Sequence, residues 1–243
     1  MLFIPTESPT LYLLPVPLSD TDPAYVMPQH NIEIARTIKY FIVENIRSAR
    51  RFLKHCDKAI DIDSLSFSVL DEHTNPQDVA AMLEPMANGH DMAVVSEAGC
   101  PAVADPGALA VAHAQKMGYK VSPLIGPSSI LLALMASGFN GQSFAFAGYL
   151  PVENGSRQAK LREMLNRINR EDQTQIFIET PYRNNKLIAE LCKLLPPHIT
   201  LCVASDITGP RQNIINKPLK WWSSAQYDYG KTPTIFLLYK ELI

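Results

Sequence analysis

The stretch Met92–Gly107, MAVVSEAGCPAVADPG, decides the fold of this chain. It begins with a short apolar run, Met92–Val95, that predicts a buried strand. Small residues and a proline follow in Ser96–Pro101, and such residues build a tight loop in which a ligand can meet bare backbone. The stretch ends in an Asp-Pro-Gly turn that begins the next helix. Because ligands of α/β sheets usually bind outside the carboxyl ends of the strands, this loop is a candidate site.

The residues that follow repeat this pattern. A helix is predicted over Ala108–Met117, with Gly118 just past its end. A second strand, Tyr119–Leu124, runs into another loop of small residues, Gly126–Ser129, and a helix is predicted over Ile130–Ser137. Two strands that end in such loops, joined by one helix, outline a ligand-binding βαβ unit. Loops of this kind occur in most α/β proteins, so the residue types alone leave an ordinary connection open.

The rest of the chain continues the alternation of strands and helices. In the first half the further strands are 11–16, 40–43 and 67–70, and the further helices are 45–55 and 77–88. In the second half the strands are 175–179, 199–204 and 234–239, and the helices are 156–170 and 184–195. The alternation in the first half predicts an α/β sheet with mostly parallel strands. A boundary just before the Gly-Pro-Ser-Ser loop gives two domains, 1–124 and 125–243.

Composition narrows the class of protein. A chain of 243 residues, 47% of them hydrophobic, suits one large domain or two small ones. The net charge of −2 gives no overall signature of nucleic-acid binding, although a local basic patch is compatible with it. The four cysteines form no CxxC pair, which favours reduced thiols, a cytoplasmic protein and no metal site. No apolar run is long enough to span a membrane, so no membrane partner is expected.

The two loops also carry a family resemblance. SEAGCPAVADPG at 96–107 and PLIGPSS at 123–129 resemble the tetrapyrrole methylase family, the class III methyltransferases that use S-adenosylmethionine (SAM). The branch that the chain resembles most is that of the small-subunit ribosomal RNA cytidine 2′-O-ribose methyltransferases. Further matching stretches lie in the same order at 11–17, 43–47, 148–151, 178–183 and 233–238. The resemblance implies two α/β domains with the cofactor cleft between them, a homodimer, no metal, and methyl transfer from SAM.

The resemblance also implies the cofactor contacts, mostly through backbone atoms. Small side chains suit this role because they let a cofactor approach the backbone closely. The implied contacts in the first domain and the loop after it are Pro15, Ala98, Gly99, Cys100, Val103, Ser128 and Ser129. Glu179 is a candidate contact for the cofactor or the substrate in the second domain, and weaker additions there are Ala204, Pro233 and Thr234. Glu179 and Arg183 match the charged positions of a family pattern, and they form either a strand-end site or an ordinary ion pair.

Candidates for catalysis lie at other strand ends. Glu44 and Arg47 match the Glu-Asp-Thr-Arg pattern of the ribosomal branch, which lines the substrate side. Glu44 and His73 are candidates for the base that accepts a hydroxyl proton. For His73, an ordinary position in a surface loop is the favoured interpretation. Glu97 and Asp105 are further carboxylates near the loop, and Asp105 is better explained as a turn residue.

A basic stripe follows Glu44 on the helix predicted over 45–55. Arg47, Arg50, Arg51 and Lys54 recur at helical spacing. Such a stripe either contacts phosphates or forms a solvated face. The partner implied by the resemblance is ribosomal RNA or the small ribosomal subunit.

Two segments depart from the ribosomal branch. The first loop is Pro15–Asp20, PVPLSD, where the branch has Pro-Thr-Pro-Ile-Gly-Asn. The segment Ser205–Gln212 lacks the lysine and glutamate of the branch pattern. The leading hypothesis is a methyltransferase that acts on ribosomal RNA, at a ribose 2′-hydroxyl by analogy. The alternatives are a methyltransferase for a tetrapyrrole or other small molecule, and a SAM-binding protein without catalytic activity.

Overall fold

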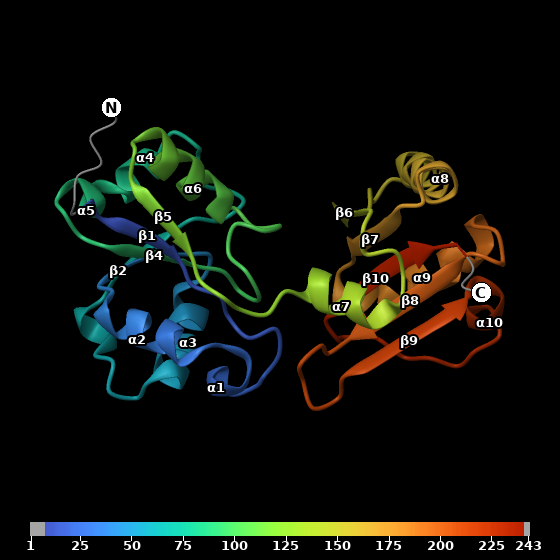
Figure 1. Cartoon of the computed structure of the whole chain (residues 1–243), viewed down its shortest axis with the longest axis horizontal. Helices are drawn as coiled ribbons and strands as arrows, with labels where there is room; N and C mark the ends of the chain where they lie inside the picture. Colours follow the sequence, from blue (N-terminus) through green and yellow to red (C-terminus); the bar gives the residue numbers. More distant parts are fainter. Residues whose placement is uncertain (1–7, 241–243) are drawn as a thin grey trace. The chain divides into compact units, whose positions relative to one another are not determined.

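The computed structural model describes residues 8–240, which fall into two compact units that divide between Ser128 and Ser129 (Figure 1). The Gly-Pro-Ser loop at 126–128 belongs to the first unit in this division, whereas the sequence analysis assigned it to the second. The loop packs closely within the first unit. A Cβ atom on Gly126 would lie only 2.2 Å from Cβ of Pro15, and the Sγ atom of Cys100 lies 3.5 Å from the carbonyl oxygen of Pro127.

The first unit is built on a parallel five-stranded sheet of order β3-β2-β4-β1-β5. Its strands are β1 (Thr10–Leu13), β2 (Tyr40–Val43), β3 (Ser66–Val69), β4 (Met92–Val95) and β5 (Lys120–Pro123). Every residue of β4 is buried, as expected for a central strand of a sheet that is covered on both faces. The α/β class and the parallel pairing predicted for the first half are confirmed.

Helices cover both faces of this sheet. They are α1 (Pro23–Val26), α2 (Gln29–Thr37), α3 (Ile46–Cys56), α4 (Val79–Met82), α5 (Glu84–Ala87) and α6 (Gly107–Lys116). Ala93 and Val95 of β4 face the core beside α2 and α3, and Met92 and Val94 face the core beside α4 to α6 (Figure 1). The single helix predicted over 77–88 is wrong. Two short helices replace it because Pro85 has no N–H with which to continue the hydrogen-bond ladder of α4.

The second unit is built on a mixed five-stranded sheet of order β6-β7-β10-β8-β9. Its strands are β6 (Phe144–Tyr149), β7 (Thr174–Ile178), β8 (Thr200–Ser205), β9 (Asn213–Pro218) and β10 (Thr234–Tyr239). Only β6 and β7 pair in parallel, while β10 is antiparallel to β7 and β8, and β9 is antiparallel to β8. The central strand β10 is buried throughout, and the sequence predicted its bounds correctly.

The helices of the second unit are α7 (Ser129–Ser137), α8 (Asn154–Glu171), α9 (Asn184–Leu194) and α10 (Leu219–Trp222). One face of the sheet packs through Phe177, Val203 and Phe236 against apolar residues of α8, α9 and α10. The other face carries α7, and the Nδ2 atom of Asn216 donates a hydrogen bond to the carbonyl oxygen of Ser137 at its end. Among residues 8–240, no helix combines the length and apolar character that crossing a membrane requires.

Candidate active site

Two loops of the first unit are joined at the carboxyl edge of the sheet. Because β1 and β4 are neighbouring parallel strands, the chain leaves both at the same edge. The amide of Val16 donates a hydrogen bond to the carbonyl oxygen of Gly99 at 2.9 Å. In return, the amide of Gly99 donates to the carbonyl oxygen of Val16 at 2.9 Å. Gly99 has φ +74°, and a Cβ atom there would lie 3.1 Å from Leu18. This pairing brings Pro15 and the Ala98–Cys100 segment together, with Ala98 exposed to solvent.

The segment after Cys100 is a strained turn. Ala102 and Ala104 have positive φ values of 66° and 61°, which cost energy for residues with a side chain. Asp105 holds this conformation, because its Oδ1 atom accepts hydrogen bonds from the amides of Ala102 at 3.0 Å and Gly107 at 2.7 Å. The turn leaves the side chain of Val103 49% exposed. The predicted cofactor contacts of the first unit are therefore presented on a constrained backbone.

Three carboxylates gather beside this turn. The Oε1 atom of Glu44, directly after β2, accepts a hydrogen bond from the amide of Glu97 at 3.1 Å. Burial raises the pKa of Glu44, and the charges of Asp105 and Glu97 raise it further against the opposing hydrogen bond from the Glu97 amide. Burial also raises the pKa of Asp105, against hydrogen bonds from three backbone amides. The Oδ2 atom of Asp105 is buried and has no hydrogen-bond partner among the described residues. This edge can hold positive charge or accept a proton.

The described contacts of His73 are with residues other than these three carboxylates. It follows β3, and its backbone amide donates to Oδ1 of Asp71 at 2.9 Å. Its side chain is 84% exposed, and its Nε2 atom lies 3.6 Å from Glu72. These contacts favour the surface-loop interpretation of His73, while its catalytic role stays a prediction.

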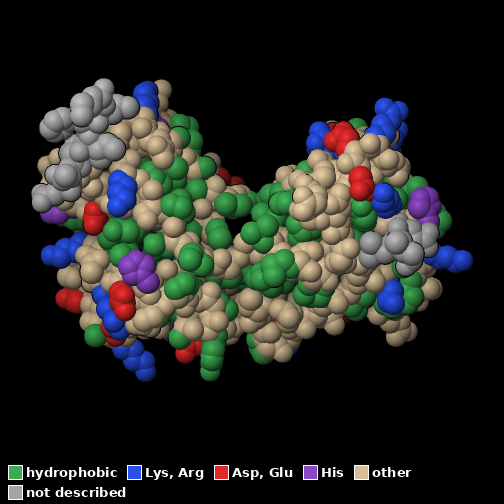
Figure 2. Space-filling view, viewed as in Figure 1, with side chains coloured by type: hydrophobic (Ala, Val, Ile, Leu, Met, Phe, Trp, Pro, Cys, Tyr) green, Lys and Arg blue, Asp and Glu red, His purple; other side chains and the backbone are tan. Residues whose placement is uncertain are grey.

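The basic stripe on α3 divides into two parts. Arg50 pairs with Asp63 at 2.6 Å, and Lys54 donates to the carbonyl oxygens of Lys58 at 2.9 Å and Ile60 at 2.6 Å. These two side chains hold the segment after α3 in place. Arg47 and Arg51 are exposed and remain the candidates for phosphate contact. On the face shown in Figure 2, lysine and arginine side chains are scattered and do not form one continuous patch.

The second unit has its own cluster at one sheet edge. Ile178 pairs with Ile235 and Thr234 pairs with Ser205, so Glu179 leaves β7 beside the start of β10. The side chain of Glu179 is 1% exposed, and its Oε1 atom accepts hydrogen bonds from Arg183 at 2.8 and 3.1 Å.

One carboxylate oxygen of Glu179 takes no part in this ion pair. Donating hydrogen bonds to the Glu179 carboxylate raises the pKa of Arg183. The Oε2 atom of Glu179 is buried and has no hydrogen-bond partner in the described part of the chain. Thus the pair stabilises the strand end and still presents one oxygen to a hydrogen-bond donor.

The remaining predicted positions lie on several different elements. Ala204 pairs with Ile235 on the face of the sheet opposite to Thr234. Ser128 is the last residue of the first unit, and Ser129 begins α7. Burial raises the pKa of the Cys100 thiol, so this thiol stays protonated at neutral pH and is a poor nucleophile. Among the described residues, no three histidine, cysteine or acidic side chains form a group that could hold a metal ion.

One feature of the second unit escaped the sequence analysis. A pocket of about 350 Å³ lies on the α9 side of β8 and β9 and is lined by Trp221, Trp222, Tyr227 and Tyr229 among others. The two tryptophans are adjacent and the two tyrosines are two residues apart, a local concentration of aromatic residues that could have drawn attention. Their meeting at one pocket depends on long-range packing.

Comparison with curated proteins finds relatives named as ribosomal RNA methyltransferases. Ribosomal RNA small subunit methyltransferase I of Vibrio cholerae is 29% identical over 216 residues, 89% of this chain and 71% of that protein. The protein of the same name in Buchnera aphidicola is 27% identical over 242 residues, 96% and 79% of the two chains.

Solved structures share the fold. The methyltransferase CobJ superposes with a TM-score of 0.62 at 19% identity, over 95% of this chain and 93% of that one. Uroporphyrin III C-methyl transferase from Thermus thermophilus gives 0.59 at 15% identity, over 95% and 97%. The model of the family Tetrapyrrole (Corrin/Porphyrin) Methylases matches residues 30–221. The chain therefore belongs to the tetrapyrrole methylase family of methyltransferases.

Proposed function

We propose that this protein transfers a methyl group from SAM to ribosomal RNA of the small subunit, at a ribose 2′-hydroxyl. The observation that carries the proposal is the joined pair of loops after β1 and β4, where the exposed residues Ala98 and Val103 lie near three carboxylates. The names of the relatives support the acceptor, and membership of the family supports methyl transfer. The ribose position rests on the resemblance to the 2′-O-ribose branch.

The residues present fit SAM. Bound SAM supplies an electrophilic methyl group on a positively charged sulfur, and carboxylates such as Glu44 favour a positive charge nearby. The unpartnered Oε2 atom of Glu179 suits a hydroxyl or amino donor, and the adenosine part of SAM carries both kinds. The residues that would hold SAM in the first unit are Pro15, Ala98, Gly99, Cys100, Val103 and Ser128. In the second unit they are Ser129, Glu179 and Thr234, whereas Ala204 is fully buried on the opposite face of the sheet and stays a prediction from the sequence alone.

Glu44 is the best-placed base for the acceptor hydroxyl. A hydroxyl that receives a methyl group must lose its proton, and a carboxylate with a raised pKa accepts protons more readily. Glu44 is half-buried, and the Glu97 amide fixes one of its oxygens. Arg47, three residues further along the chain, is exposed and suits a phosphate of the acceptor strand. The task of these residues is to align the hydroxyl with the methyl carbon and the sulfur.

The test supplies the purified protein with labelled SAM and small ribosomal subunits that lack ribose methylation. We expect label in the ribosomal RNA, at a position that mapping identifies as a 2′-O-methylated nucleotide. Label that enters a tetrapyrrole and leaves the RNA untouched would move the acceptor to small molecules. If calorimetry shows SAM binding but neither acceptor is methylated, the protein binds SAM without catalytic activity and the proposal is wrong.

A matched pair of variants ties the activity to the loop. Ala98→Trp fills the exposed loop after β4, and we expect it to abolish SAM binding and transfer. Ala112→Trp places the same side chain on an exposed position of α6. Because that position lies within a helix and outside both loops, we expect this control to retain both properties.

A further inference from the structure

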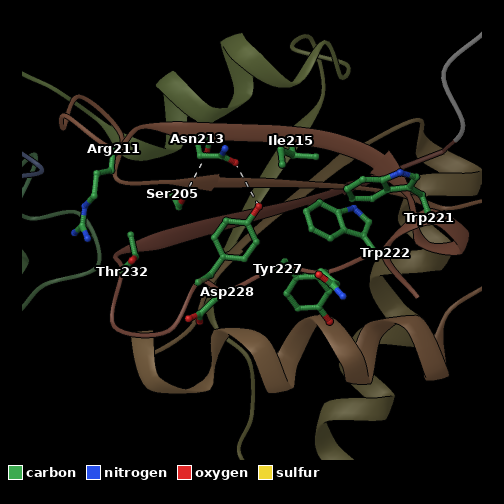
Figure 3. Close-up of a pocket in the computed structure, with 11 residues that line it drawn as sticks. Ser205, Arg211, Asn213, Ile215, Trp221, Trp222, Tyr227, Asp228 and Thr232 are labelled. Atoms are coloured by element: carbon green, nitrogen blue, oxygen red, sulfur yellow. Dashed lines mark hydrogen bonds between the residues drawn. The ribbon is translucent and has the colours of Figure 1, made fainter. Parts of the chain in front are cut away.

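The aromatic pocket of the second unit has a rigid floor and an accessible rim (Figure 3). Trp222 is 1% exposed and donates from Nε1 to the carbonyl oxygen of Leu201 at 3.0 Å, which fixes its ring. Trp221 stands edge-on to Trp222, with ring centroids 5.0 Å apart, and is 42% exposed. Tyr227 is partly exposed and stacks on Tyr229, with 6.2 Å between the ring centroids. The pocket therefore offers two accessible aromatic side chains, Trp221 and Tyr227, held by two buried ones.

Hydrogen bonds from α9 fix the loop that carries the tyrosines. Asn185 of α9 accepts a hydrogen bond from the amide of Tyr229 at 2.8 Å and donates to Asp228 at 2.9 Å. Asn184 is fully buried and donates to the carbonyl oxygens of Tyr229 at 3.0 Å and Thr232 at 2.9 Å. Because these contacts already order the wall of the pocket, binding there loses little conformational entropy.

Polar groups line the part of the pocket that lies away from Trp221. Tyr229 and Asn213 are joined by a hydrogen bond of 3.4 Å between the hydroxyl and Oδ1. Arg211 is exposed, and its backbone amide donates to Asp206 at 2.8 Å. In Figure 3 the guanidinium of Arg211 and the indole of Trp221 lie at opposite ends of the pocket. An aromatic face, a cation, and amide and hydroxyl groups between them are the groups that bind the base, phosphate and sugar of an unpaired nucleotide.

We propose that this pocket binds one unpaired nucleotide of a single-stranded RNA segment. The base stacks on Trp221 and Tyr227, and Arg211, at the opposite end of the pocket, pairs with a phosphate of the neighbouring nucleotide in the strand. The volume of about 350 Å³ lies at the small end of the range for ligand pockets, roughly 300–1,000 Å³, which suits one nucleotide. The inference rests on the proposed function, because it takes RNA as the acceptor. It adds a binding contact outside the methyl-transfer site, since none of the predicted SAM contacts lines the pocket.

The tryptophans of the chain serve as a spectroscopic probe of this pocket. Its only two tryptophans are Trp221 and Trp222, so tryptophan fluorescence, excited at a wavelength that tyrosine does not absorb, reports on the pocket. We expect a single-stranded hexauridylate to quench this fluorescence saturably, and a duplex RNA of equal length to do so far less. Uridine monophosphate serves as the free-nucleotide arm. If the monophosphate binds as tightly as the hexamer, the pocket serves a free nucleotide and the RNA form of the proposal is wrong.

Variants then test the two ends of the pocket by anisotropy of a fluorescein-labelled hexauridylate. Trp221→Ala is expected to weaken binding roughly 5-fold to 100-fold, the range for loss of one base–aromatic stack. Arg211→Ala is expected to weaken binding and to lower the slope of log affinity against log salt by about 0.7. Tyr25→Ala and Arg170→Ala, at exposed positions of α1 and α8, are the matched controls and are expected to bind like the parent. Because Trp221 and Arg211 are exposed, their variants are expected to fold, and circular dichroism checks this.

The outcomes separate this inference from the proposed function. Unchanged affinity in Trp221→Ala overturns the pocket, even if the protein methylates ribosomal RNA. Hexauridylate binding that depends on Trp221 and Arg211 supports the pocket, even if no methyl group reaches RNA. Absence of any quenching by the hexamer also overturns it.

Discussion

Glu44 is the single residue on which the proposed chemistry depends most. Glu44→Gln keeps the shape and removes the base, so we expect kcat for RNA methylation to fall by about 10²-fold to 10⁴-fold. Burial and neighbouring carboxylates raise the pKa of Glu44 above its usual value of 4.5. Because the ionised form is the active one, kcat should rise with pH through that raised pKa and then level off. The matched control is Glu72→Gln, at a carboxylate that is 86% exposed. An unchanged kcat in Glu44→Gln would remove Glu44 from the mechanism.

Arg183 is predicted to matter for stability. Arg183→Met leaves the buried Glu179 carboxylate with only Thr180 as a donor. Arg183 itself is 24% exposed, so water compensates part of the loss. We expect the free energy of unfolding to fall by about 2–3 kcal/mol, measured by urea denaturation. Arg167→Met breaks an ion pair whose side chains are 42% and 43% exposed, and should cost less than about 1 kcal/mol. Equal losses in the two variants would show that burial of Glu179 contributes nothing.

Among the helices, α3 depends on the residue that precedes it. The side chain of Asn45 accepts hydrogen bonds from the amides of Arg47 at 2.9 Å and Ser48 at 3.3 Å. Asn45→Ala should lower the free energy of unfolding by about 1 kcal/mol, because two amides lose their partner. Asn45→Asp keeps an acceptor and favours the positive end of the helix dipole, so it should retain the parent stability. Thermal unfolding of the two variants checks this, and equal stabilities would exclude a capping role.

The strands show how far the sequence could predict the fold. The runs Met92–Val95, Tyr40–Val43 and Thr234–Tyr239 were predicted with correct bounds, because central strands are apolar along their whole length. Strand β9 was missed, since Asn213, Lys217 and Pro218 break the apolar pattern of an edge strand. Strand β6 was missed because Gly148 interrupts its sequence pattern. This glycine has φ +66° and lies where the pairing of β6 with β7 shifts register.

The site was predictable in part for a related reason. The loops of small residues after strands are local signals, and the sequence shows them directly. The mixed pairing of the second sheet depends on contacts between residues far apart in the chain. The same holds for the unpartnered oxygens of Asp105 and Glu179 and for the aromatic pocket. Composition and spacing carry no information about such contacts.

For the whole molecule, SAM should act as a stabilising ligand. A ligand that binds only the folded state stabilises it by about 2.7 kcal/mol at 100 times its Kd. For a chain of 243 residues this corresponds to a rise in Tm of roughly 5–10 °C, measurable by differential scanning fluorimetry. Ala98→Trp should unfold near the parent Tm without SAM and show no rise with it, whereas Ala112→Trp should show the full rise. A full rise in Ala98→Trp would mean that SAM binds elsewhere than at the loop after β4, and the proposed site would then have to be abandoned while the family assignment stands.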